Sequence, residues 1–313
     1  MRETPVAVCY FLNVGQGTSQ VIHLGNRRAI VVDTGPQQCS TRSPLLSLLK
    51  DRDIQKIEAL ILSHNDQDHI GDAPALLDNF KKRIDRVFFL DDRPRTENKL
   101  YDILKNSYRK KHITRIIRLE NDDIPKNLFS DGNISIDLLF PDCSQNIFAQ
   151  SPNQTCGIIA LSIGTQIVIF SGDAPVEAWK SIVEKNGRIE SQIFTIPHHG
   201  GGFIRSKPET ESVINDLNWF HEKAMQTKFA IVSLGAKNKY GHPSPQIIQS
   251  FAERKAEVLC TQVTLQCTGN IEICDAVCCG TIVANIGLNT TQIQNIDGLR
   301  ERKKEFLHRL CVS

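Results

Sequence analysis

Apolar, strand-like segments of this chain repeatedly end in histidine or aspartate. Residues 58–62 (EALIL) run directly into a block rich in both residue types, and residues 192–196 run into a pair of histidines. The polar residues at five such strand ends are Asp33, the block His64 to His69, Asp173, the pair His198-His199, and His242. Loops at strand ends are the usual place for ligands in α/β folds, so we expect a layered α/β protein with a site built from these loops.

The alternation of strand and helix patterns supports this fold class. The predicted strands are 6–13, 21–24, 29–32, 58–62, 86–90, 134–140, 157–163, 166–171, 192–196 and 229–234. The predicted helices are 43–50, 73–82, 175–185 and 245–254. Gly25-Asn26 between the second and third strands indicates a hairpin. Strands with interspersed helices favour layers over a helical bundle or an all-β barrel.

Composition excludes several classes of protein. The 313 residues suggest one or two domains, and 40% hydrophobic with 23% charged residues is ordinary for a globular chain. The net charge is only +2, so the protein as a whole does not attract nucleic acid or anionic membrane, and an anionic substrate needs a local site. The N-terminal apolar run is too short to span a bilayer and lacks export features, so we expect a cytoplasmic protein with no membrane partner and with reduced thiols.

The His and Asp residues have the chemistry of a metal site. Imidazole and carboxylate bind zinc, manganese and iron, and His64, Asp66, Asp68 and His69 fall within one loop. Asp173 is suited to bridge two ions. Two ions roughly 3.5–4 Å apart can stabilise both the attacking and the leaving oxygen of a phosphoester.

Six sequence blocks resemble a known family. In order they are FLNVGQGTS, VVDTG, LSHNDQDHIGD, IFSGDA, IPHHGG and GAKNKYGHPSP. They are similar to blocks of metallo-β-lactamase-fold hydrolases, and more narrowly to the nuclease-like domain of the competence DNA-uptake protein ComEC and its stand-alone soluble relatives. The resemblance covers about residues 6–290. It implies a metallo-β-lactamase-like αββα four-layer sandwich and metal-dependent hydrolysis of a phosphodiester.

The resemblance also implies roles for individual residues. The implied metal ligands are His64, Asp66, Asp68, His69, Asp173, His198 and His242. The implied catalytic residues are Asp68, His198 and His199, with one histidine of the adjacent pair binding metal and the other acting on the substrate. Asp33 would orient the ligands by hydrogen bonding. Lys239 and Tyr240, beside His242, either bind substrate phosphate or are solvated loop residues.

The chain departs from the family pattern at four positions. The family usually has Asp where Asn13 and Thr18 stand, Ser where Gly201 stands, and Gly where Asp72 stands. None of these changes removes an implied ligand. The loss of two aspartates near the ligands bears on metal choice.

The expected domain organisation is one hydrolase domain with additions. We expect residues 1–290 to form the domain, with a surface insertion at about 91–127 and a Cys-rich segment at 257–290. Residues 291–313 would form a basic helical tail, whose default interpretation is a solvated helix that could also bind nucleic acid or a partner. The clustered cysteines are Cys260, Cys267, Cys274, Cys278 and Cys279. Without paired C-x-x-C spacing they favour buried thiols over a disulfide or a structural zinc site.

The predicted function is therefore a metal-dependent DNA nuclease that uses hydroxide activated by two divalent ions, Zn²⁺ or Mn²⁺. DNA would be the substrate partner, an activating protein and an oligomer are further options, and an effector role in prokaryotic defence follows by analogy only. Two alternatives stay open. One is a hydrolase of small phosphoesters, nucleotides or lactones, and the other is a catalytically silent binding protein of the same fold.

Overall fold

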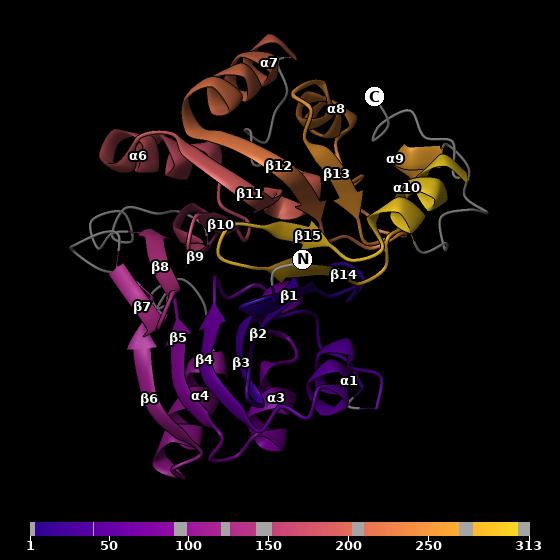
Figure 1. The fold of residues 1–313 in the computed structure, drawn as a ribbon. Coiled ribbons are helices and arrows are strands. Elements are labelled where there is room, and N and C mark those ends of the chain that lie inside the picture. The colour runs from indigo at the N-terminus through magenta and orange to yellow at the C-terminus, as the bar shows by residue number, and fades with distance from the viewer. Residues whose placement is uncertain are drawn as a thin grey trace.

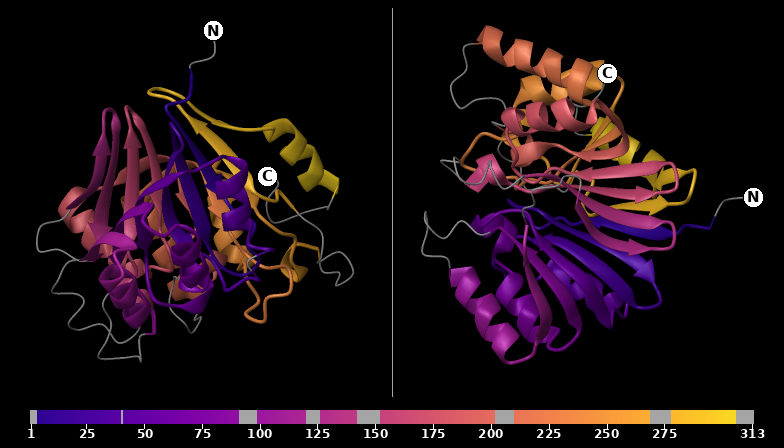
Figure 2. Two further views of the ribbon diagram at one scale, coloured as in Figure 1. Left: turned by 90° about the horizontal axis from the view of Figure 1, so that it is seen from below. Right: turned by 90° about the vertical axis from the view of Figure 1, so that its left-hand side faces the viewer.

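Two β-sheets pack face to face and carry helices on both outer sides (Figure 1; Figure 2). The computed structural model describes residues 4–39, 41–90, 99–119, 126–141, 152–201, 210–268 and 278–305. Within these ranges the four layers follow the order helix, sheet, sheet, helix, which the right-hand view of Figure 2 shows edge-on. The predicted αββα sandwich is confirmed.

The first sheet has eight strands in the order β15-β14-β1-β2-β3-β4-β5-β6. Its strands are β1 (Ala7–Phe11), β2 (Ser19–Gly25), β3 (Arg28–Thr34), β4 (Lys56–Leu62), β5 (Ile84–Phe89), β6 (Ile113–Arg118), β14 (Ile282–Ile286) and β15 (Thr291–Ile293). The predicted hairpin at Gly25 joins β2 to β3, and the strands from β3 to β6 are parallel. β1 pairs with both β2 and β14, so segments from the two ends of the chain share this sheet.

The second sheet has seven strands in the order β13-β12-β11-β10-β9-β8-β7. Its strands are β7 (Lys126–Asp131), β8 (Ile134–Phe140), β9 (Ile158–Ile163), β10 (Gln166–Phe170), β11 (Ile189–Thr195), β12 (Met225–Val232) and β13 (Glu257–Cys260). The strands from β7 to β10 are antiparallel, whereas β10 to β13 are parallel. Parallel strands in each sheet bring their carboxyl ends to one edge, where ligand loops belong.

Helices cover the outer face of each sheet (Figure 1). Those on the first sheet are α1 (Pro44–Asp51), α3 (Ala73–Asn79) and α4 (Lys99–Arg109), and those on the second are α6 (Val176–Asn186), α7 (Thr210–Trp219) and α8 (Pro245–Glu253). The shorter α2 (Gln67–Ile70) and α9 (Leu265–Thr268) and the C-terminal α10 (Ile296–Glu305) complete the set among the described residues. The start of α1 is determined by its sequence, because the Ser43 hydroxyl caps the helix by accepting a hydrogen bond from Leu46 N–H and Pro44 is its first residue.

Three apolar cores hold the layers together. The middle core lies between the sheets, where the rings of Phe11 and Phe170 stack with centroids 6.0 Å apart. A second core places Trp179 of α6 against Phe194 of the second sheet, and the third places Leu49 of α1 under the first sheet. Burial of this apolar area is the main force that holds the sandwich together.

Two segments differ from their expected placement. Part of the expected surface insertion at 91–127 belongs to the sandwich, because β6 pairs in parallel with β5 and forms the edge of the first sheet. Beyond residue 290, β15 pairs with β14, and Leu299 of α10 is buried in the middle core. Residues 291–305 thus continue the sandwich, while residues 306–313 lie outside the described part of the chain.

The Cys-rich segment is described only in part. Cys260 and Cys279 are buried, Cys267 and Cys278 are half-buried, and Cys274 lies outside the described residues. In the described helices, none combines the length and the apolar character that a membrane span requires.

Candidate metal centre

The loop after β4 supplies most of the candidate ligands. β4 is an almost wholly buried strand, and Ser63 and His64 follow it where the chain leaves the sheet. The chain then enters α2, which carries Asp68 and His69. Gly17 allows the neighbouring turn to lie against α2, because a Cβ at that position would fall 2.3 Å from the carbonyl oxygen of Asp68. A backbone hydrogen bond from Thr18 N–H to the same oxygen fixes this contact.

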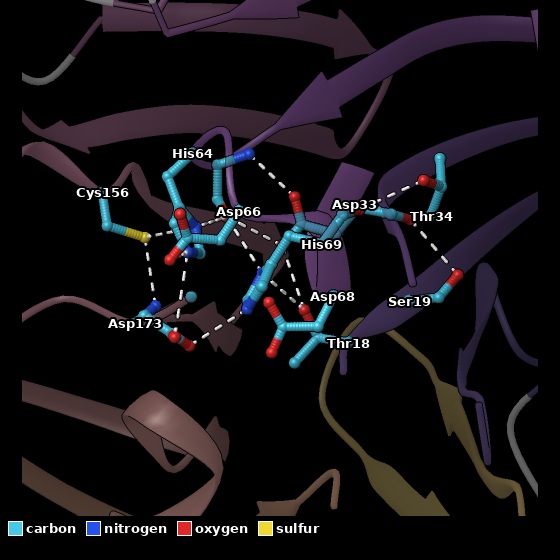
Figure 3. Close-up of polar contacts among 12 residues, drawn as sticks. Thr18, Ser19, Asp33, Thr34, His64, Asp66, Asp68, His69, Cys156 and Asp173 are labelled. Carbon is cyan, nitrogen blue, oxygen red and sulfur yellow. Dashed lines mark hydrogen bonds and ion pairs between the residues drawn. The ribbon is translucent and has the colours of Figure 1, made fainter. Parts of the chain in front are cut away.

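Asp33, at the end of β3, holds this loop from behind (Figure 3). Its Oδ1 accepts the backbone N–H of Ser63, and its Oδ2 accepts the hydroxyls of Ser63 and Thr18. The same Oδ2 lies 2.8 Å from Nδ1 of His69. Asp33 is buried and adopts a left-handed φ of 53°, a strained conformation that clusters at functional sites. These contacts place Asp33 directly behind the candidate ligands, and its orienting role stays a prediction.

Asp173 faces the loop from the second sheet, at the end of β10. Its Oδ1 lies 3.1 Å from Nε2 of His69 and 3.8 Å from Nε2 of His199, while its Oδ2 lies 3.8 Å from Nε2 of His64. Two clusters of potential ligands result: His64, His69 and Asp173, and then Asp68, His69 and His199. Asp68 Oδ2 lies 3.1 Å from His199 Nε2.

In the centre, three buried histidines each have Nδ1 in a polar contact with the surrounding protein and Nε2 directed toward the other candidate ligands. They are His64, His69 and His199. Nδ1 of His69 contacts Asp33, and Nδ1 of His199 lies 2.8 Å from the carbonyl oxygen of Ser233. Nδ1 of His64 lies 3.0 Å from the Ser63 hydroxyl. Nε2 of His64 is buried and has no hydrogen-bond partner among the described residues. Nε2 of His69 and Oδ1 of Asp173 are also buried, and they face each other as an ion pair at 3.1 Å. Buried polar atoms normally have partners, so this set of donors fits divalent ions.

The electrostatics of the centre couple these groups. Burial by itself lowers the pKa of His69, but the carboxylates of Asp173 and Asp33 raise it well above its usual range. Burial by itself raises the pKa of Asp173, but the neighbouring histidines hold it well below its usual range. The pKa of Asp68 is also lowered, against its own burial, by its hydrogen bond with His199. Without an ion, the carboxylates are therefore charged and share protons with the rings.

His198 and His242 lie at the outer side of the centre. The backbone of both His198 and His199 is left-handed, with φ of 53° and 56°, so the adjacent side chains point in different directions. His199 enters the second cluster, whereas the half-exposed His198 has its Nε2 3.9 Å from Oδ2 of Asp173. The ring of His242 lies 5.4 Å from that of His198. Burial lowers the pKa of His242 to about 4, so this ring is neutral at pH 7.

The remaining predicted residues surround these groups. Asp66 Oδ2 lies 3.6 Å from Nε2 of His64, and its side chain is partly solvated. Tyr240 stacks on His242, and the Lys239 ammonium lies 5.2 Å from the centre of the Tyr240 ring. The structure thus brings every predicted site residue to one end of the sandwich. The division of these residues between metal binding and catalysis stays a prediction.

Three of the departures from the family pattern have structural reasons. Thr18 contacts both Asp33 and His69 Nδ1 through its hydroxyl, at 3.1 and 2.9 Å. A Cβ at Gly201 would lie 2.0 Å from Cε1 of His242, so glycine leaves room for that ring. Asp72 accepts hydrogen bonds from the Ser43 hydroxyl and from the backbone N–H of Gln38, and so ties α3 to α1.

Cys156, which the sequence analysis did not select, contacts two of the candidate ligands (Figure 3). Its buried Sγ accepts the backbone N–H of Asp173 at 3.1 Å and lies 3.4 Å from Nδ1 of His64. Burial and the charge of Asp173 raise the pKa of this thiol well above its usual range, so it is uncharged at pH 7. Sγ faces the Nδ1 side of His64, away from the centre, which makes Cys156 a positioning residue. A lone cysteine outside any motif gave no signal for this role.

Replacing Cys156 with alanine should weaken metal binding by about tenfold, because outer contacts of this kind typically contribute 10- to 100-fold in affinity. Cys156→Ser keeps an acceptor for the Asp173 N–H and should lose less of the metal affinity. The measurement is competition with a chromophoric chelator. The matched control is Cys9→Ala, which removes a buried thiol from the middle core, away from the centre. Equal metal affinity of Cys156→Ala and Cys9→Ala would refute the positioning role.

The fold is that of metallo-β-lactamase-like proteins, and the candidate metal centre lies at one end of its sandwich. Residues 12–124 match the family model described as the metallo-beta-lactamase superfamily. Over this segment the chain is similar to that superfamily. Two clusters of histidine and aspartate at the sheet ends are consistent with the divalent ions that this fold binds.

Particular relatives agree with this assignment. ComE operon protein 3 of Bacillus subtilis (strain 168) is 26% identical in an alignment 267 residues long, which covers 80% of this chain and 31% of that protein. The chain thus spans less than a third of the length of this curated relative. CmlA, a diiron beta-hydroxylase from Streptomyces venezuelae, matches with a TM-score of 0.50 and 13% identity, over 82% of this chain and 53% of that one. Igni18, a metallo hydrolase from Ignicoccus hospitalis KIN4/I, matches with a TM-score of 0.50 and 13% identity, over 80% and 94%. These two structures show the shared fold alone.

Proposed function

We propose that this chain is a metal-dependent phosphodiesterase that cleaves DNA. The observation that carries the proposal is the position of Asp173, whose two carboxylate oxygens face different imidazoles. Oδ1 lies 3.1 Å from Nε2 of His69, and Oδ2 lies 3.8 Å from Nε2 of His64. A carboxylate shared between two sets of donors is what a pair of divalent ions needs.

The candidate ligands are numerous enough to bind two ions. His64, Asp66 and Asp173 would hold one ion, and Asp68, His69 and His199, with Asp173 shared, would hold the other. When bound, the pair would supply Lewis acidity that lowers the pKa of a water molecule and offsets charge on the phosphate. Equal numbers of imidazoles and carboxylates suit zinc, and the oxygen share makes manganese a competitor.

The chain's own residues would handle protons and orientation. Asp68 is ionised and partly solvated, so it can orient the attacking water and accept its proton. His198 is half-exposed beside Asp173 and can donate a proton to the leaving oxygen. His242, kept neutral by burial, can donate a hydrogen bond to a phosphate oxygen without carrying charge.

DNA is proposed as the substrate on the basis of sequence. The blocks around the candidate ligands resemble those of competence DNA-uptake proteins, and ComE operon protein 3 matches over most of this chain. Lys239 adds a local cation beside the centre, as a chain of net charge +2 requires for an anionic substrate. Cytoplasmic location, an activating partner, an oligomeric state and a defence role stay predictions.

The test begins with protein stripped by chelator and reloaded separately with Zn²⁺ or Mn²⁺. Labelled single- and double-stranded DNA and bis(4-nitrophenyl) phosphate are then followed for wild type, Asp68→Ala and the control Asp78→Ala. Asp78 is an exposed aspartate of α3, outside the candidate centre. We expect metal-restored cleavage of DNA in wild type and in the control, and a loss of at least about 10²-fold in Asp68→Ala.

Each alternative has its own outcome in this assay. Hydrolysis of the small diester without cleavage of DNA would replace the nuclease with a small-molecule phosphodiesterase. Stoichiometric metal binding without hydrolysis of either substrate would contradict the phosphodiesterase proposal and favour a binding protein or a non-phosphate ester.

A further inference from the structure

Aromatic rings lead from the candidate metal centre to the surface. We call the rings of His199, His198, His242 and Tyr240 the ring file. Successive centroids in this file are 6.4, 5.4 and 5.7 Å apart. The inner end is buried against His69, while Tyr240 at the outer end is 60% exposed. Among the described residues, no other large hydrophobic side chain at this end of the sandwich is exposed to this degree.

The loop that carries Tyr240 is fixed by hydrogen bonds. The Asn238 side chain accepts the backbone N–H of His242 at 2.8 Å and donates to the carbonyl oxygens of His242 and Gly235 at 2.8 and 2.9 Å. Ser244 N–H donates to the carbonyl oxygen of Gly200, which links this loop to the histidine pair. The exposed ring therefore has a defined position relative to the centre.

One side of the Tyr240 ring is already occupied. The ring of His242 lies on it at an interplanar angle of 18°, which is an offset stack. The Lys239 ammonium also lies within cation–π distance of the ring. The Tyr240 side chain remains largely exposed despite these two contacts, and an exposed aromatic ring beside a cation is typical of surfaces that bind single-stranded nucleic acid.

We propose that Tyr240 forms a base-stacking subsite, in which an unpaired nucleobase beside the scissile phosphate stacks on the ring and Lys239 contacts the adjoining phosphate. This inference rests on the proposed function and names its substrate class. In a duplex both faces of a base are covered by its neighbours, so stacking on Tyr240 requires a single strand or a splayed end. The subsite would therefore make the chain prefer single-stranded DNA over duplex DNA and over small diesters.

The test measures stacking directly, without hydrolysis. Metal-free protein in chelator is titrated into a single-stranded oligonucleotide that carries 2-aminopurine, and both the quenching of fluorescence and the dissociation constant are recorded. The variants are Tyr240→Ala and Tyr240→Phe. The control is Tyr108→Ala, which removes a Tyr that is 52% exposed on α4. Tyr240→Ala should weaken binding by about tenfold and abolish quenching, while Tyr240→Phe and the control stay close to wild type.

An abasic oligonucleotide isolates the base contact. Removing the base should weaken binding to wild type by the same factor by which Tyr240→Ala weakens binding to the intact strand. It should not weaken binding to the Tyr240→Ala variant any further, because the two changes remove the same interaction. If wild type binds abasic and intact strands equally, or quenches the probe equally in a duplex, the stacking subsite is wrong.

The two proposals fail separately. Metal-dependent cleavage of DNA without quenching would refute the subsite and leave the phosphodiesterase intact. Quenching that depends on Tyr240, without hydrolysis of any phosphodiester after metal is restored, would retain the subsite and refute the phosphodiesterase.

Discussion

Replacing Asp173 with asparagine should lower metal-dependent hydrolysis by at least about 10³-fold, the equivalent of several kcal/mol of transition-state stabilisation. Asparagine preserves the shape of the side chain but removes the charge that faces His64 and His69 from the second sheet. If this carboxylate contacts both ions, as proposed, its loss affects both. Bound metal, measured by elemental analysis after gel filtration, should therefore fall along with activity.

A matched variant separates this effect from general damage. Asp72 is another buried aspartate near the loop, but its carboxylate binds Ser43 and Gln38 and does not face the centre. Asp72→Asn should cost stability while keeping metal content and most of the activity. If Asp173→Asn retained two bound ions, the shared-carboxylate interpretation would be wrong.

Adding metal to stripped protein should raise its thermal midpoint, and the rise should be larger at pH 8 than at pH 6. The folded-state pKa of His69 is raised by Asp173 and Asp33, against the effect of burial. The protonated ring therefore stabilises the metal-free protein below about pH 6.5, and this stability is lost as the pH rises through the folded-state pKa. Asp173 has the opposite effect on the pH dependence of stability. Its pKa is lowered in the folded state, so its ionised carboxylate stabilises the fold above about pH 4, and this stabilisation is lost on acidification.

The ion competes with the proton on His69, so metal binding strengthens as the pH rises. At a hundred times the dissociation constant, one site adds about 2.7 kcal/mol to the free energy of unfolding. That corresponds to an increase of about 4 °C for a chain of this size. Differential scanning fluorimetry with Zn²⁺ and Mn²⁺ at both pH values measures the effect, with Asp173→Asn as control. A larger rise at pH 6 would show that the ions do not displace protons from these imidazoles.

The fold and the composition of the centre could be predicted because both depend on local patterns. β4 reads as a buried apolar strand, and His64 follows it without an intervening turn. The same rule placed Asp173 after β10 and the histidine pair after β11. Since parallel strands end at the same edge, each sheet brings its own loops together, and the packing of the two sheets places the two sets of loops side by side.

The individual roles depend on contacts that are distant in sequence. His198 and His199 are indistinguishable as adjacent histidines, and only the Ser233 carbonyl oxygen fixes His199 with its Nε2 toward Asp68. Cys156 lies beside Asp173 only because of the way the chain folds, and no sequence motif predicts this contact. The segment that contains β6 is charged and resembles a surface excursion, because an edge strand can carry exposed residues such as Arg115 and Arg118.

The centre draws its ligands from loops of both sheets. Asp68 and His199, which lie within hydrogen-bonding distance, are 131 residues apart in sequence. An ion held by both would act as a reversible cross-link between the two halves of the sandwich, and it can form only after the chain has closed that long loop. We expect metal to slow global unfolding far more than it accelerates folding. A contact between residues so distant in sequence forms after the transition state of folding, and in unfolding it must break before that transition state is reached. A supply of divalent ions would then set the lifetime of the folded chain in addition to its activity.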